Sequence, residues 1–168
     1  MPDRPAADGF GDVAPLAHGL TWEDQPVGFR FRSAARTVTE TDLVSFVGLA
    51  GFIGSMFLDA RRATELGYRG RVVPGMLTLV LAEGLVLQTN VLHGTGIAFL
   101  GLEMEVRDPV YVGDTVEVVV EVTASRATSR PGRGIVTSTN TVLNQEGDVV
   151  LVYRPTRMQR GVGAEEAG

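Results

Sequence analysis

The sequence predicts a single α+β domain in which an antiparallel sheet wraps around one long buried helix. From Met76 to Val91 apolar residues occupy almost every face of the predicted helix, which is typical of a helix surrounded by other structure. After it, three or four segments in succession alternate apolar and polar residues, as antiparallel strands do. The length of 168 residues also fits one domain.

The composition excludes several classes of protein. The chain has 15 basic and 20 acidic residues, a formal charge of −5 and no cysteine. Without cysteine it has no disulfide scaffold, thiol nucleophile or thiolate metal site. Every basic residue is an arginine, and the arginines form no basic stripe, so nucleic acid is not an expected partner. The bias toward Arg, Ala, Gly and Val is typical of a GC-rich bacterial genome.

Both ends of the chain are expected to be flexible. Residues 1–18 form a lead-in rich in Pro, Gly, Ala and Asp, and residues 161–168 form a polar tail, which leaves 19–160 as the domain. The start has no charged-then-apolar pattern of a signal peptide. The longest apolar run, 72–92, is interrupted by a proline and polar residues, as in a buried helix and not a membrane span. We therefore expect a cytoplasmic protein.

The first expected element is a strand. It is predicted from Gly28 to Val38, because Phe29 and Phe31 alternate with arginines in the manner of a half-buried strand.

Two short helices are expected next. Thr39, followed three residues later by Asp42, is typical of a capping box at a helix start. A loop from Gly51 to Leu58 then leads to Asp59, which is a good N-cap for a helix from Ala60 to Leu66.

The long helix and the remaining strands complete the prediction. Pro74 suits the first position of the long helix, where its missing N–H is no loss. In the strand expected from Gly96 to Val106, the alternation changes phase at Gly101, which indicates a bulge. Three further strands are predicted at Thr115 to Thr123, Ile135 to Leu143 and Val149 to Arg154.

Four short stretches of sequence, in this order and spacing, resemble the MaoC-like hydratase/dehydratase branch of the hot-dog fold superfamily. They are T-W-E-D-Q-P-V-G at 21–28, R-T-V-T-E-T-D-L-V-S-F at 36–46, R-G-R-V-V-P-G-M-L at 69–77 and P-V-Y-V-G-D-T-V at 109–116. The resemblance covers roughly residues 21–158. It implies a hot-dog fold, in which the antiparallel sheet wraps the central helix.

The resemblance also implies a chemistry. Members of this family add water to, or remove it from, the double bond of an enoyl thioester carried on coenzyme A or acyl carrier protein, a lyase reaction without a separate cofactor. A backbone N–H at the start of the central helix polarises the thioester carbonyl. In this chain that N–H belongs to Gly75, between Pro74 and Met76, and Pro74 stands where the family usually has a histidine.

The chain departs from the family at the acid–base positions. Active members have an aspartate and a histidine after the first helix that transfer protons, and an asparagine that orients them. Matching Gly51 and Asp59 to the family pattern puts Phe52 at the aspartate, Gly54 at the asparagine and Phe57 at the histidine. Phenyl side chains cannot transfer protons, so the usual machinery is missing.

Three other residues are candidates for the missing acid or base. Glu83 is the only charge within the long helix, and burial there would raise its pKa, but it also fits a subunit interface or a solvent-facing edge. His93 follows the long helix and has a side chain suited to proton transfer, or it has a surface or capping role. Asp59 is either a relocated base or simply a helix N-cap.

Several charged residues have alternatives of their own. Arg126, Arg130 and Arg133 flank a predicted hairpin and either contact the phosphates of coenzyme A or lie solvated at the turn. His18 lies in the lead-in and is expected to be inert. Because no cluster of His, Asp and Glu has metal-ligand spacing, no metal site is predicted.

Two functions therefore remain open. The first is a divergent hydratase/dehydratase of enoyl or 3-hydroxyacyl thioesters. The second is a non-catalytic hot-dog subunit that binds the acyl chain in an apolar pocket lined by Phe52, Met56 and Phe57 and pairs with an active hydratase; a close variant catalyses another reaction in a biosynthetic pathway. In either case the resemblance implies a homodimer or a hetero-oligomer with another hot-dog subunit, because sheets of this superfamily usually pair edge to edge.

Overall fold

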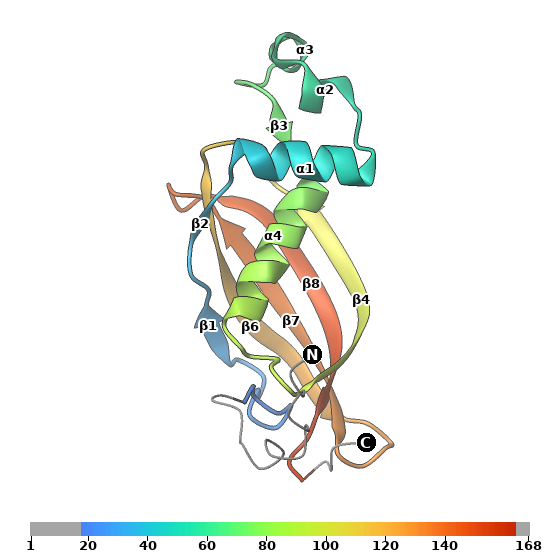
Figure 1. The fold of residues 1–168 in the computed structure, drawn as a ribbon. Coiled ribbons are helices and arrows are strands. Elements are labelled where there is room, and N and C mark those ends of the chain that lie inside the picture. The colour runs from blue at the N-terminus through green and yellow to red at the C-terminus, as the bar shows by residue number, and fades with distance from the viewer. Residues whose placement is uncertain (1–17, 164–168) are drawn as a thin grey trace, which may run out of the picture.

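The computed structural model describes residues 18–163, so nearly all of the predicted lead-in and tail lies outside the described residues. A curved antiparallel sheet wraps around the long helix α4 (Gly75–Gln88), as predicted (Figure 1). The sheet order is β1-β6-β7-β8-β4, and the short strand β2 also pairs with β6. The strands are β1 (Arg30–Arg32), β2 (Arg36–Thr37), β4 (Gly96–Val106), β6 (Thr115–Ala127), β7 (Arg133–Leu143) and β8 (Val149–Arg160).

The hydrophobic core lies between α4 and the inner face of the sheet. In β6 alternate residues point inward, as the sequence pattern predicts, and they are almost fully buried. The main core side chains are Leu77, Leu79, Leu81, Leu85 and Val86 of α4, Val116, Val118, Val120 and Val122 of β6, and Leu151 and Tyr153 of β8.

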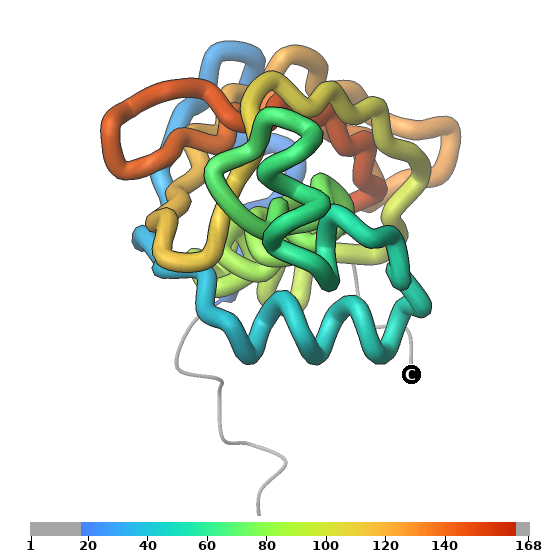
Figure 2. Tube along the Cα trace, turned by 90° about the horizontal axis from the view of Figure 1, so that it is seen from above, coloured from blue at the N-terminus to red at the C-terminus, as the bar shows by residue number. Residues whose placement is uncertain are grey.

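A second group of elements covers the amino end of α4. It consists of α1 (Glu40–Ala50), α2 (Ser55–Leu58), α3 (Ala60–Glu65) and the two-stranded ribbon of β3 (Val72–Val73) and β5 (Val110–Tyr111). Figure 2 shows α1 and the α2–α3 segment lying across this end of the molecule. This group builds the surroundings of the candidate site.

The predictions that rest on local side-chain chemistry are confirmed. Thr39 and Asp42 form a reciprocal capping box at the start of α1. The Asp59 carboxylate accepts the Arg61 N–H at 2.9 Å and caps α3. The pairing of β4 with β8 shifts register next to Gly101, as the predicted bulge requires.

The strand predicted from Gly28 to Val38 is instead divided into β1 and β2. The division lies at Ser33, whose Oγ accepts the Val118 N–H at 2.9 Å in place of a backbone carbonyl. The Ser33 N–H still donates to the Val118 carbonyl at 2.9 Å. The segment thus stays attached to β6 while the regular ladder is interrupted.

Two further predicted boundaries were wrong. The loop predicted from Gly51 to Leu58 contains the short helix α2, whose N-cap Gly54 has no side chain to signal a helix start. The long helix ends at Gln88 and not at Val91, because Asn90 adopts a left-handed conformation with φ of 60°.

Strand β8 continues to Arg160, beyond the predicted end at Arg154. It passes through Pro155, a residue without a backbone donor. The strand tolerates this proline because the pairing with β7 pauses there, between Tyr153 and Thr156, and resumes in the same register.

One side of the central helix is not covered within this chain. The outward stripe of α4 exposes Met76, Val80 and Leu87. Strand β4 is the edge of the sheet and is exposed along almost its whole length. Its large exposed apolar residues are Ile97, Phe99, Leu100, Leu102, Met104 and Val106. We call these nine residues the apolar edge face. None of the helices in residues 18–163 is long and apolar enough to cross a bilayer.

Candidate functional site

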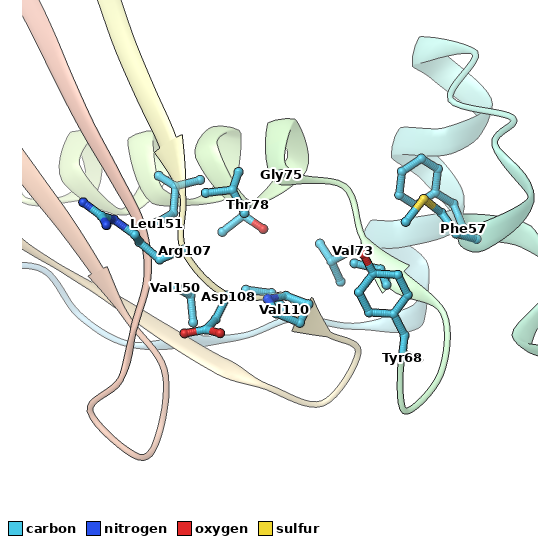
Figure 3. Close-up of a pocket in the computed structure, with 14 residues that line it drawn as sticks. Phe57, Tyr68, Val73, Gly75, Thr78, Arg107, Asp108, Val110, Val150 and Leu151 are labelled. Carbon is cyan, nitrogen blue, oxygen red and sulfur yellow. The ribbon is translucent and has the colours of Figure 1, made fainter. Parts of the chain in front are cut away.

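A pocket of about 330 Å³ lies at the amino end of α4 (Figure 3). It is bounded by α2, the segment before β3, the first turn of α4, the turn from β4 to β5, and β8. The lining residues are Met56, Phe57, Tyr68, Val72, Val73, Gly75, Thr78, Val106, Arg107, Asp108, Pro109, Val110, Val150 and Leu151. Most of this lining is apolar, which suits a ligand with a hydrocarbon part.

The helix start inside the pocket presents unpaired backbone donors. Pro74 is the N-cap of α4, not its first helical residue as predicted, and it makes no side-chain cap. Its carbonyl accepts the N–H groups of Leu77 at 2.8 Å and Thr78 at 3.1 Å. The preceding N–H groups have no intrahelical acceptor, as at any helix start, and the helix dipole adds partial positive charge there. The Gly75 amide is therefore suited to an electronegative ligand atom.

The backbone at Gly75 forms the pocket surface itself. A Cβ atom built at this position would lie 2.8 Å from Cγ2 of Val106 on β4. Any larger residue would push against that wall. Glycine thus lets the main chain reach the cavity, and the predicted role of its N–H stays a prediction.

The aromatic residues predicted at the acid–base positions form one cluster. The ring of Phe52 lies 5.3 Å from that of Phe46 and 6.1 Å from that of Phe57, measured between centroids. Only Phe57 lines the pocket, together with the predicted Met56, while Phe52 packs behind it. A Cβ at Gly54 would lie 3.2 Å from the Phe57 ring, so that glycine makes room for the phenyl group.

The two residues predicted beside Gly75 do not line the pocket. Pro74 is buried under the surrounding elements. The side chain of Met76 points outward and is 42% exposed, as part of the apolar edge face.

The three acid–base candidates also lie outside the pocket. Asp59 caps α3, and hydrogen bonds from the side chain and backbone of Arg61 lower the pKa of its carboxyl group. Glu83 lies eight residues along α4 from Gly75, or about 12 Å at the helical rise. His93 follows the opposite end of α4, where its carbonyl accepts the Gly19 N–H at 2.7 Å.

Glu83 belongs to a polar cluster beneath the middle of α4. Its two carboxylate oxygens accept hydrogen bonds from Arg157 at 2.7 and 2.6 Å. Nearby on the sheet, the Ser138 hydroxyl donates to Asn140 Oδ1 at 2.7 Å. Tyr153 is fully buried, and its burial, together with the Glu83 charge, raises the pKa of its phenol. We call these five residues the polar cluster.

The polar residues that do line the pocket were not predicted from the sequence. Tyr68, Arg107 and Asp108 each contribute a side chain, and Thr78 contributes a buried one. Figure 3 shows Tyr68 on the side of Phe57, and Arg107 and Asp108 on the opposite side. The only sequence signal for these residues was their position: Asp108 directly precedes the family-like stretch 109–116, and Tyr68 directly precedes the stretch 69–77.

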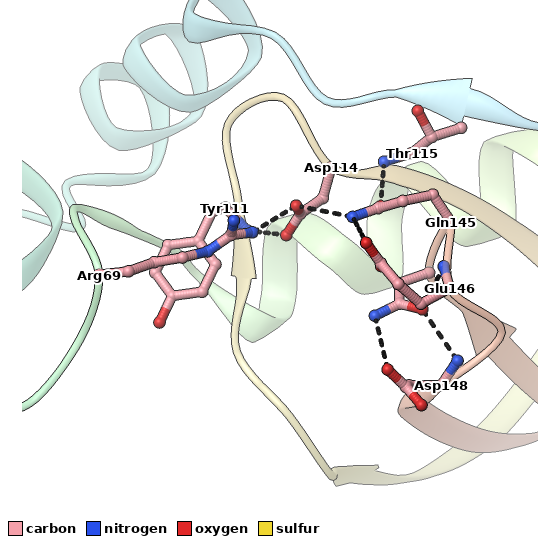
Figure 4. A network of polar contacts seen from close by, with 8 residues as sticks. Arg69, Tyr111, Asp114, Thr115, Gln145, Glu146 and Asp148 are labelled. Carbon is pink, nitrogen blue, oxygen red and sulfur yellow. Dashed lines mark hydrogen bonds and ion pairs between the residues drawn. The ribbon is translucent and has the colours of Figure 1, made fainter.

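A network around Asp114 holds the outer wall of the pocket (Figure 4). The carboxylate accepts the Tyr111 N–H at 2.8 Å, Gln145 Nε2 at 3.2 Å and the guanidinium of Arg69. Arg69 also lies 4.2 Å above the centre of the Tyr111 ring. Burial acts to raise the pKa of Asp114, but the hydrogen bonds from Arg69, Tyr111 and Gln145 outweigh it, and the pKa is lowered.

The remaining charged candidates lie far from the pocket. Arg126, Arg130 and Arg133 lie on and beside the turn between β6 and β7, at the opposite end of the molecule from the start of α4 (Figure 1). Across the described residues, no group of three or more His, Asp or Glu side chains is arranged to hold a metal ion.

Comparisons with known proteins match this architecture. A family model described as the FAS1-like dehydratase domain region matches residues 25–152. The (R)-specific enoyl-CoA hydratase of Aeromonas caviae is 33% identical over 110 residues, which cover 66% of this chain and 78% of that protein. The 3-hydroxybutyryl-CoA dehydratase of Methylorubrum extorquens is 31% identical over 110 residues, covering 66% and 68%.

Solved structures agree with the predicted fold. A MaoC-like dehydratase from Rhodospirillum rubrum has a TM-score of 0.77 at 30% identity and covers 85% of this chain and 98% of its own. A Mycobacterium tuberculosis protein described as a double hot-dog fold has a TM-score of 0.76 at 22% identity, over 89% of this chain and 47% of its own. The chain therefore belongs to the MaoC-like hydratase/dehydratase family of hot-dog proteins.

Proposed function

We propose that this chain binds acyl thioesters in the pocket at the amino end of α4 and serves as the acyl-binding subunit of a hydratase/dehydratase. The thioester carbonyl accepts a hydrogen bond from the Gly75 N–H, and the acyl group lies against Phe57 and Val106. The carrier is coenzyme A or acyl carrier protein. A second hot-dog subunit supplies the acid and the base.

The observation that carries this proposal is the lining of the pocket. A free backbone donor at a helix start stabilises negative charge on a carbonyl oxygen, and an apolar wall accommodates an acyl chain. Phe57, from the segment after α1, also faces this cavity and can neither give nor take a proton. Hydration needs both transfers, and Glu83, His93 and Asp59 do not line the pocket, so under this proposal a second subunit supplies the proton-transfer groups.

The apolar edge face supports pairing with a second hot-dog subunit. An uncovered edge strand of 11 residues presents free backbone donors and acceptors, together with large apolar side chains. A large group of exposed apolar side chains marks an interaction site. Pairing along β4 also covers the exposed stripe of α4 and closes the side of the molecule next to Val106, which lines the pocket.

One observation favours a second candidate, a hydratase that acts alone. Asp108 lines the pocket, and its carboxylate makes no ion pair or hydrogen bond with any residue in 18–163. A free, exposed carboxylate at the rim of the pocket is a suitable base for water. Under this candidate Asp108 replaces the family aspartate from a different strand connection.

Binding and hydration assays on the full chain separate the two candidates. We expect calorimetry to detect binding of butyryl-CoA, while crotonyl-CoA is not hydrated. The informative variant combines Phe52→Asp, Gly54→Asn and Phe57→His, which restores the family pattern. A side chain at position 54 would contact the Phe57 ring, and the change to histidine removes that phenyl group. Hydration by this triple variant alone would indicate an intact thioester pocket without proton-transfer groups.

Three results would count against the proposal. If butyryl-CoA does not bind, the chain does not carry the thioester site. If the unaltered chain hydrates crotonyl-CoA and Asp108→Asn abolishes the activity, the second candidate is correct. Light scattering measures the mass of the unaltered chain and of the β4 variant Leu102→Arg. If both are monomers at micromolar concentration and no hot-dog partner is captured, the subunit assignment fails.

A further inference from the structure

We propose that Tyr68 is the residue that recognises an oxygen on the β-carbon of the acyl group, so that the pocket prefers 3-hydroxyacyl over plain acyl thioesters. The inference rests on the proposed thioester site and adds to it the residue that determines its substrate preference.

The position of Tyr68 is the first observation. Its half-buried side chain lines the pocket from the segment between α3 and β3. In Figure 3 the ring lies beside Val73, with its hydroxyl end directed toward the start of α4. A group held at the Gly75 amide therefore places its next carbons in the space that this hydroxyl faces.

The second observation is that the Tyr68 hydroxyl is unused. Its backbone N–H donates to the Ala63 carbonyl at 3.0 Å, but the phenol makes no hydrogen bond with any side chain or backbone group of residues 18–163. The hydroxyl is not among the buried polar atoms of the described residues, so water reaches it and a ligand that enters the pocket can replace that water. Inside a mostly apolar pocket, such a free donor and acceptor is suited to a polar atom of the ligand.

The third observation is that the residues next to Tyr68 fix its position. Arg69 bonds to Asp114 and stacks on Tyr111, which attaches the segment to the turn after β5. Arg71 pairs with Glu40 at the start of α1. Both arginines line a separate hollow, with Glu40, Gly70, Tyr111 and Val112, and this hollow shares no lining residue with the pocket. The segment is thus anchored from outside while Tyr68 faces inward, which is the preorganisation that ligand recognition requires.

The chemistry of the recognition follows from the two ligand oxygens. The Gly75 amide takes the thioester carbonyl, and the Tyr68 hydroxyl donates to, or accepts from, the 3-hydroxyl group two carbons away. A plain acyl chain has no such oxygen and leaves the phenol unpaired. Because one hydrogen bond between neutral groups contributes on the order of 1 kcal/mol, the preference is expected to be about five- to tenfold.

The test compares two ligands and two tyrosine variants by calorimetry on the full chain. The ligands are 3-hydroxybutyryl-CoA and butyryl-CoA, which differ by the one oxygen. We expect Tyr68→Phe to weaken binding of 3-hydroxybutyryl-CoA about five- to tenfold and to change binding of butyryl-CoA less than about twofold. The matched control is Tyr111→Phe, which keeps the ring under Arg69 and removes a hydroxyl outside the pocket; it should leave both affinities unchanged.

Each possible outcome decides between the alternatives. Equal affinities of the unaltered chain for the two thioesters, or equal losses for both in Tyr68→Phe, would overturn the role of Tyr68 and leave the thioester site standing. Failure of both thioesters to bind the unaltered chain would overturn the proposed function, and the role of Tyr68 with it. A loss in Tyr68→Phe that is confined to the hydroxylated ligand supports the inference.

Discussion

The amino end of α4 and its middle use polar groups in opposite ways. At the amino end, three polar groups face a cavity: the Gly75 N–H, the Tyr68 hydroxyl and the Asp108 carboxylate. None of them forms a hydrogen bond with another of the described residues. In the middle, Glu83 and Arg157 are bonded to one another through both carboxylate oxygens. The first arrangement leaves hydrogen-bonding capacity for a ligand. The Glu83–Arg157 pair uses it within the fold, although Asn140 Nδ2 and Tyr153 Oη in the same cluster have no partner among the described residues.

This difference shows why a charge in a buried helix is a poor indicator of a catalytic site. Glu83 was the most conspicuous charge in the sequence, yet its carboxylate is bound to an arginine from β8. A general base needs a free lone pair directed at the substrate. The residues with free groups, Tyr68 and Asp108, lie in connecting segments, where functional side chains are often found.

The largest expected effect comes from breaking the polar cluster. Replacing Glu83 with leucine leaves the guanidinium of Arg157, whose side chain is 10% exposed, without its partner. An unpaired charge of this kind is expected to lower the free energy of unfolding by about 3 kcal/mol. Urea denaturation followed by circular dichroism measures the change.

The matched control for Glu83 is Glu105, which pairs with Arg107 at the surface with both side chains about half exposed. Glu105→Leu should change the free energy of unfolding by no more than about 0.5 kcal/mol. Similar effects of the two substitutions would show that the polar cluster is not a structural unit.

A smaller effect is expected from changing the open end of the helix. In Gly75→Ala the added methyl group meets Val106 and narrows the space over the amide, so binding of butyryl-CoA should weaken about tenfold, as measured by calorimetry. The control is Gly84→Ala in the same helix, where a Cβ meets nothing within 4 Å. That change should stabilise the fold by about 0.5–1 kcal/mol and leave binding unaltered. Equal binding by both variants would contradict the site at Gly75.

The smallest effect concerns Asp114 in the wall of the pocket and the dependence of the free energy of unfolding on pH. Because the pKa of Asp114 is lowered in the fold from its ordinary value of 3.8, the unfolded chain binds the proton first as the pH falls. The stabilisation is complete above that value and is lost as the pH falls through the lower, folded pKa. Asp114→Asn should cost about 1 kcal/mol at neutral pH and reduce the slope of stability against pH below about pH 4. Urea midpoints from pH 3 to 6 test this, and an unchanged slope would contradict it.

The parts of the fold that depend on local chemistry were predictable from the sequence. The capping box at Thr39, the N-cap at Asp59 and the bulge at Gly101 each involve neighbouring residues or a single change of alternation. The family resemblance added the order of the elements and the position of Gly75. These signals are short in range or shared with relatives, so one sequence was sufficient to find them.

The rest of the site depends on contacts between distant segments. Glu83 and Arg157 are 74 residues apart, and nothing near either residue indicates the other. Tyr68 and Asp108 become pocket residues only because the β3–β5 ribbon brings their segments to the start of α4. The helix α2 lacks a side-chain cap, and Ser33 replaces a backbone acceptor, so neither left a pattern in the sequence.

The apolar edge face also has a consequence for the supply of this chain in a cell. Under the proposed pairing, chain produced in excess of its partner keeps an uncovered strand of 11 residues and an exposed helix stripe, and such surfaces are prone to aggregate. Any subunit that covers β4 stabilises the folded chain by mass action, so the melting temperature should rise with the concentration of that subunit. Balanced synthesis of the two subunits would then protect the chain from aggregation, as a more stable core also would.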